Sequence, residues 1–124
     1  MVSAIQAKST TAMGREFEED LVKHLKFDNA RRSKSSGASF HDPIDITSDH
    51  FVIEAEATEK KSYSVKVSFW EEIRLKAHSG KKPLIAFRFR NTENPRKSID
   101  LIAMDKNDFI ELMEKAYGNT TGNI

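Results

Sequence analysis

Two acidic residues spaced two positions apart, Glu54 and Glu56, form a pattern that could hold a metal ion. They lie in residues 51–57, Phe-Val-Ile-Glu-Ala-Glu-Ala, where apolar and β-branched residues predict a strand. The period of a strand places both carboxylates on one face, roughly 7 Å apart. Two like charges in that position repel unless a cation lies between them, although Glu-x-Glu is also common on solvated strand faces.

Asp45 and Glu18 are the other acids whose positions indicate chemistry. Asp45 lies between Ile44 and Ile46, so in the expected strand it should point away from the face that these two share. Glu18 falls on the apolar arc of an expected helix, where a carboxylate is costly unless compensated, or at the edge of that arc in contact with solvent. Because the sequence has no cysteine, any metal must be held by oxygen or imidazole, which favours Mg²⁺ or Mn²⁺.

Basic residues gather between the first expected helix and Asp45. The net charge over all 124 residues is only +1, so bulk charge does not predict a nucleic-acid-binding protein. Residues 23–37, however, contain five basic residues and a single acid, Asp28. Basic loops beside an acidic centre suit a protein that attracts phosphate and also holds a metal, although an ordinary mixed surface gives the same distribution.

The elements that position these residues form one α/β domain in the order α-β-β-α-β-β-α. We expect the domain at residues 12–117, with loose tails at 1–11 and 118–124. The predicted helices are 12–26, 65–78 and 105–117, and the predicted strands are 43–47, 51–57, 82–90 and 98–104. Residues 29–42 are expected to form a loop.

Two of the helices carry apolar residues at helical spacing. In the last helix, which Asp105 should cap, we expect the apolar residues to face inward: Phe109, Leu112, Met113 and Ala116. In the middle helix, Trp70 and Ile73 belong to a stripe that is either core or a dimer contact.

No segment has the composition of a membrane span or of a secretory signal. The longest apolar runs fall well short of roughly 18 residues, and the first eleven residues have no long apolar stretch. We therefore expect a protein of the cytoplasm, or of the host cytoplasm if a phage encodes it.

Taken in order, these motifs resemble those of the PD-(D/E)XK nuclease superfamily, and within it the archaeal-type Holliday junction resolvases and their phage relatives. The similarity covers residues 14–117 and is carried by the segments 14–21, 31–37, 43–46, 53–61 and 82–89. It implies a restriction-endonuclease-like mixed β-sheet flanked by helices. One residue departs from the family pattern, because Glu56 stands where most members have a lysine that orients or activates water.

The resemblance implies a Mg²⁺-dependent endodeoxyribonuclease, with Mn²⁺ as a possible substitute. Asp45 and Glu54 would be the main ligands, completed by the carbonyl of Ala55. Glu18 would bind a second ion or a metal-bound water, and Glu56 would act as a base or an additional ligand. Lys60, Lys61 or Lys66 could reach the site in place of the family lysine, and Lys60 completes the expected catalytic set.

The implied substrate is branched DNA, cut as a Holliday junction by a homodimer with two symmetric sites. The residues expected to hold phosphate are Arg31, Arg32, Lys34, Ser35, Ser36, Lys61 and Lys66. A flexible solvated loop is the alternative for residues 31–36. Two other functions stay open: a restriction or repair nuclease with another DNA substrate, and a catalytically silent module for DNA binding or assembly.

Overall fold

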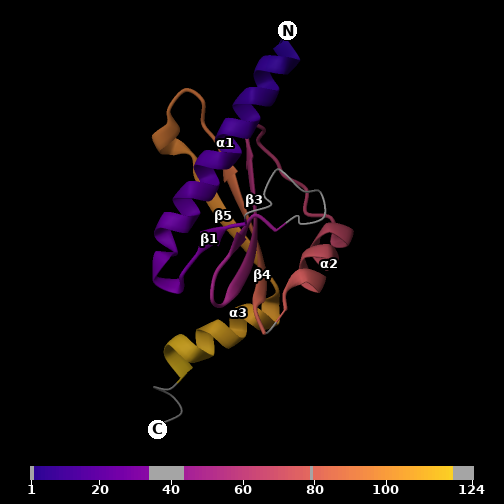
Figure 1. Cartoon of the computed structure of the whole chain (residues 1–124), viewed down its shortest axis with the longest axis vertical. Coiled ribbons are helices and arrows are strands. Elements are labelled where there is room, and N and C mark those ends of the chain that lie inside the picture. Colours follow the sequence, from indigo (N-terminus) through magenta and orange to yellow (C-terminus); the bar gives the residue numbers. More distant parts are fainter. Residues whose placement is uncertain (1, 34–43, 79, 119–124) are drawn as a thin grey trace.

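A computed structural model describes the chain at residues 2–33, 44–78 and 80–118, and its centre is a five-stranded mixed sheet between helices (Figure 1). The strands are β1 (Arg31–Arg32), β2 (Ile46–Thr47), β3 (Phe51–Thr58), β4 (Lys82–Phe89) and β5 (Ile99–Met104), and they lie in that order across the sheet. Only β3 and β4 run parallel, because α2 (Val67–Lys76) crosses over between them. The predicted α/β class with a mixed sheet is confirmed.

The central strands are buried on both faces by helices from opposite sides. Phe17 of α1 (Val2–His24) packs with Ile53 and Ala55 of β3, whereas Ile73 of α2 packs with Val52 on the other face. The sequence of a strand that is covered on both faces is a nearly continuous run of apolar residues, and residues 51–57 have this composition. Glu54 and Glu56 interrupt this run on the α2 side and are therefore unusual members of the sheet interior.

The N-terminal boundary differs from the expectation. Helix α1 begins at Val2, so residues 2–11, which we expected to be a tail, are helical. This stretch contains alanine, glutamine and lysine, which favour helix, and it has no proline or glycine before Gly14. At the other end, residues 119–124 of the expected tail lie outside the described residues. None of the described helices combines the length and the apolar composition that crossing a bilayer requires.

The short strand β1 was also missed, because two arginines carry no apolar alternation. Arg32 pairs with Ile46, and the backbone N–H of Ser33 donates to the carbonyl of Asp45 at 2.9 Å. The first part of the expected loop is therefore an edge strand of the sheet. Residues 34–43, which contain the rest of that loop, lie outside the described residues.

Helix α3 (Lys106–Met113) begins as predicted, but its packing was predicted wrongly. Asp105 caps it by accepting hydrogen bonds from the backbone N–H groups of Asn107 and Asp108. The apolar residues expected to face inward lie largely in solvent, with Phe109 51 % exposed and Met113 43 %. The physical reason is position: α3 lies at the end of the sheet and not over one of its faces (Figure 1). Leu112 is half-buried, and Ala116 is exposed.

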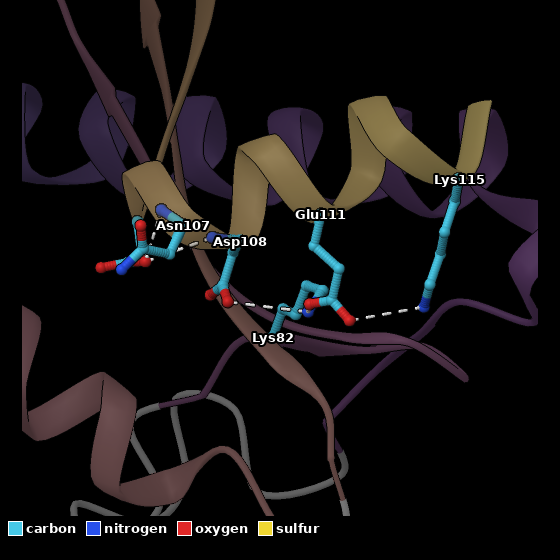
Figure 2. A network of polar contacts seen from close by, with 6 residues as sticks. Lys82, Asn107, Asp108, Glu111 and Lys115 are labelled. Atoms are coloured by element: carbon cyan, nitrogen blue, oxygen red, sulfur yellow. Dashed lines mark hydrogen bonds and ion pairs between the residues drawn. The ribbon is translucent and has the colours of Figure 1, made fainter. Parts of the chain in front are cut away.

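Ion pairs attach α3 to the start of β4. The ammonium of Lys82 lies between the carboxylates of Asp108, at 3.6 Å, and Glu111, with Lys115 reaching the other oxygen of Glu111 (Figure 2). The Lys82 side chain is 16 % exposed, but Glu111 is 50 % exposed, so each of these contacts stabilises the protein only modestly, as surface ion pairs do. They hold α3 in place while its apolar residues stay accessible.

Asp28, in the short 3₁₀ helix η1 (Lys26–Asp28), joins the end of α1 to the β2–β3 turn. Its buried carboxylate accepts hydrogen bonds from the backbone N–H of His50, at 3.0 Å, and from the His50 ring. The carboxylate also bonds to the Ser48 hydroxyl, and its own burial is outweighed by these bonds, which hold its pKa below the usual range. The contribution of Asp28 to the free energy of unfolding is therefore fully present above about pH 4, and it is lost as the pH falls through the lowered pKa of Asp28.

We expect Asp28→Ala to lower the free energy of unfolding by about 3 kcal/mol at pH 7, because several buried donors lose their acceptor. Urea unfolding measures the change. The matched control is Asp49→Ala, one residue beyond Ser48 in the same turn, whose exposed side chain accepts a bond from Asn29. That variant should cost about 1 kcal/mol or less, and equal losses in the two variants would contradict the role given to Asp28.

Candidate active site

Asp45 and Glu54 are brought together by the register of β2 and β3. Ile46 lies opposite Ile53 in this antiparallel pair, and continuing the register by one residue brings Asp45 alongside Glu54. The carboxylate of Asp45 is fixed there, because Oδ2 accepts a hydrogen bond from the backbone N–H of Ala55 at 2.9 Å. Two acids nine positions apart in the sequence thus meet on one side of the sheet.

Glu54 is the most unusual of the acids. It is 7 % exposed, and among the described residues its Oε2 is a buried side-chain atom with no hydrogen-bond partner. Burial first, then hydrogen bonding and charge from Asp45, then the charges of Glu56 and Glu18, raise the pKa of Glu54 to about 10. Without a cation beside it, burial and the neighbouring acids both favour the neutral form of this carboxyl.

Glu18 approaches the same cluster from α1. It is 8 % exposed, and its Oε1 accepts a hydrogen bond from Nε of Arg32 on β1 at 2.9 Å. Burial and the charge of Asp45 raise the pKa of Glu18, and Arg32 partly offsets that rise. Arg32 therefore offsets part of the cost of burying the Glu18 carboxylate on the apolar side of α1.

Glu56 lies at the open side of the cluster. It is half-buried, and burial, followed by the charges of Asp45 and Glu18, raises its pKa. It lines a hollow of about 780 Å³ together with Lys60 and Tyr63. The four predicted acids thus lie within electrostatic reach of one another. As they stand, no three or more His, Asp or Glu side chains in residues 2–33, 44–78 and 80–118 are arranged to hold a metal ion.

Tyr63 is a residue of this site that the sequence analysis missed. Its pKa is raised by burial and then by the negative charges of Glu56 and Glu54, which places its phenol beside the acids. Its ring stacks on Phe87 of β4 with the centroids 5.1 Å apart. The available signal was an aromatic residue in the polar segment Ser62-Tyr63-Ser64, directly between a strand and a helix.

The other predicted residues are distributed around the cluster. Arg31 is exposed and lines a hollow beside Arg32. Lys61 is exposed near the end of β3, whereas Lys66 is the residue before α2 and does not line the hollow at Glu56. Ala55 is buried, and its N–H is the group that fixes Asp45. Lys34, Ser35 and Ser36 lie outside the described residues.

Comparison of the chain with protein-family models, with curated proteins and with solved structures found no match.

Proposed function

We propose that this protein is a metal-dependent endodeoxyribonuclease whose centre is the pair Asp45 and Glu54. The observation that carries the proposal is the buried Glu54 carboxyl, with one oxygen that has no partner among the described residues, beside a second carboxylate fixed by the sheet. Burying such a group is costly unless a ligand uses it. Strongly raised pKa values that have a specific charged neighbour are typical of functional sites.

The residues of the cluster fit Mg²⁺ or Mn²⁺. The donors are carboxylate oxygens, the ligands that hard divalent cations prefer. Mg²⁺ keeps several waters and is commonly bound by one or two carboxylates together with substrate phosphate. Asp45 and Glu54 provide such a pair, so a complete cage of protein ligands is not required. The carbonyl of Ala55 and the carboxylate of Glu18 are the proposed additional oxygen donors.

A bound divalent cation would supply an acidified water and polarisation of a phosphate oxygen. The side chains would supply proton transfer, positioning and hydrogen bonds to the phosphate. Glu56, half-buried and with a raised pKa, is placed at the hollow where a substrate would enter, and it can accept the proton of the attacking water. Arg32 holds Glu18 in position. The phenol of Tyr63 can donate a hydrogen bond to a phosphate oxygen beside Glu56.

The proposed substrate is branched DNA, with the Holliday junction as the leading form and a homodimer as the cutting unit. Two symmetric cuts need two active sites related by a two-fold axis. The test is an assay panel of four-way junction, flap, linear duplex and single strand, each with Mg²⁺ and with a chelator. Preferential junction cleavage supports the full proposal. Cleavage of another substrate corrects the substrate alone, and binding without any cleavage favours a silent DNA-binding module.

In the β1 region, we expect the side chain of Arg31 to contact a DNA phosphate. Its side chain makes no ion pair with the described residues, whereas Arg32 is engaged by Glu18. We expect Arg31→Ala to flatten the dependence of log affinity on log salt by about 0.9 for duplex arms. Fluorescence anisotropy across a salt series measures the slope. Lys106→Ala, on α3, should leave the slope unchanged, and an unchanged slope for Arg31→Ala would remove Arg31 from the interface.

A further inference from the structure

We propose that a second hollow, next to the one at Glu56, binds a single-stranded stretch of nucleic acid. This hollow, here called the β4–β5 hollow, has a volume of about 600 Å³ and is rimmed by Lys60, Lys61, Arg90 and Lys97. The inference rests on the proposed function for the class of ligand. Its test uses binding without metal and therefore does not depend on cleavage.

The floor of the β4–β5 hollow is apolar and accessible. Phe89 of β4 pairs with Ile99 of β5, and Phe87 pairs with Leu101 in the same register. Phe89, Ile99 and Leu101 all line the hollow, with Ile99 57 % exposed and Leu101 46 %. These side chains are neighbours across paired strands, and a contiguous exposed apolar patch is typical of a surface that binds a partner.

The rim of the β4–β5 hollow has a net positive charge, which favours binding of an anion. Within the described part of the chain, the four cationic side chains make no ion pair, and two acids, Glu59 and Glu93, lie among them. Nearby Arg88 differs, because Asp100 and Asp20 engage its guanidinium. The cations around the hollow thus remain available for phosphate groups.

Aromatic rings connect this hollow with the acids. Tyr63 stacks on Phe87, and Phe87 meets Phe89 edge to face with the centroids 6.1 Å apart. The first ring lies beside Glu56 and Glu54, and the last lines the β4–β5 hollow. Glu59 and Lys60 line both hollows, so the two are neighbours. A chain bound over the basic rim would lead toward the carboxylates.

This combination fits unpaired nucleotides better than a duplex or a second copy of this chain. Single strands bind to basic grooves in which bases contact aromatic and apolar side chains, whereas a duplex keeps its base faces stacked inside. A second copy docked on the edge strand β5 would cover Ile99 and Leu101. It would also bring two like-charged rims together. Charge complementarity therefore favours a polyanion over a second copy of this chain as the ligand of the hollow.

The test is the affinity for a fluorescent oligothymidylate of about 12 nucleotides, measured by anisotropy in a chelating buffer. We expect Arg90→Glu/Lys97→Glu to weaken binding by about tenfold or more, and Leu101→Ser to weaken it several-fold. The charge-matched control is Lys26→Glu/Lys106→Glu, on two exposed lysines elsewhere, and it should bind like the wild type. If the double glutamate variant unfolds, Arg90→Gln/Lys97→Gln replaces it.

Equal binding by test and control variants would overturn the proposal. So would a wild-type dimer that Leu101→Ser converts to monomer without a change in oligonucleotide affinity, because the surface would then be a dimer contact. Glu54→Gln separates the two proposals, since it should retain full oligonucleotide binding. If the wild type does not cleave any substrate, the proposed nuclease function is wrong. The binding measurements still test whether the β4–β5 hollow binds single-stranded nucleic acid.

Discussion

Glu54→Gln is expected to abolish Mg²⁺-dependent cleavage and, at the same time, to make the metal-free protein more stable. Cleavage should fall on the order of 10³-fold or more, because an amide does not neutralise the cation that the reaction needs. Stability should rise because glutamine fills the same buried space with no carboxyl to ionise. A loss of function combined with a gain of stability is the signature of a residue kept for chemistry.

The pH dependence of stability follows from the same group. The pKa of Glu54 rises from an ordinary 4.5 to about 10 on folding, so the folded state keeps a proton that the unfolded chain releases. The free energy of unfolding should therefore be highest below pH 4.5 with respect to this group, and should decline as the pH rises toward 10. At pH 7 the loss attributable to Glu54 is on the order of 3 kcal/mol, which Glu54→Gln should restore.

Denaturant unfolding at several pH values, with and without Mg²⁺, measures both effects. In the wild type, Mg²⁺ should raise stability at pH 8 more than at pH 5, because the cation replaces the proton on Glu54. The control is Glu72→Gln, an exposed acid on α2 that lines neither hollow, which should change neither cleavage nor the pH slope. A Glu54→Gln protein that cleaves normally would remove Glu54 from the metal site.

Glu56 is the position of the second large effect. We expect Glu56→Ala and Glu56→Gln each to reduce cleavage by about 10²–10⁴-fold, the contribution of a positioned general base. DNA binding should remain nearly intact, since it depends on the cationic residues and phosphate. Single-turnover cleavage and anisotropy on the same junction separate the two quantities.

Glu56→Lys, which introduces the residue usual at this position in the proposed nuclease family, distinguishes two roles. Retained cleavage would mean that the position orients or activates water, and lost cleavage would mean that the carboxylate is a required ligand. Full wild-type cleavage by Glu56→Ala would instead make Glu56 a bystander. The neighbouring base would then be sought at Lys60 or Tyr63, which line the same hollow.

The sequence by itself was sufficient to predict the α/β class with a mixed sheet and to single out four acids that the structure brings near one another. Period-2 alternation places Glu54 and Glu56 on one face of a strand, and helical period places Glu18 on the buried arc of α1. Both patterns depend on local backbone geometry, which a short window of residues specifies. The cap at Asp105 is local in the same way, and the structure contains it.

Tertiary structure decided which groups from distant segments meet, because packing and strand register are not local properties. Register brings Asp45 alongside Glu54, a pair already expected as ligands of one metal, and β1 brings Arg32 to Glu18, a contact that the sequence did not indicate. Tyr63 lies beside the acids with its ring stacked on Phe87 of β4, a contact between segments far apart in the sequence.

The same reason explains the error in α3. An amphipathic pattern predicts which side of a helix is apolar, but it does not say whether anything lies beneath that side. Helix α3 lies beyond the end of the sheet, where Lys82 contacts its acids, and Phe109 and Met113 are exposed to solvent there. Periodicity predicted most of the helices and strands and the faces that carry the acids. Three-dimensional packing determined which of those faces were covered and which charges were brought together.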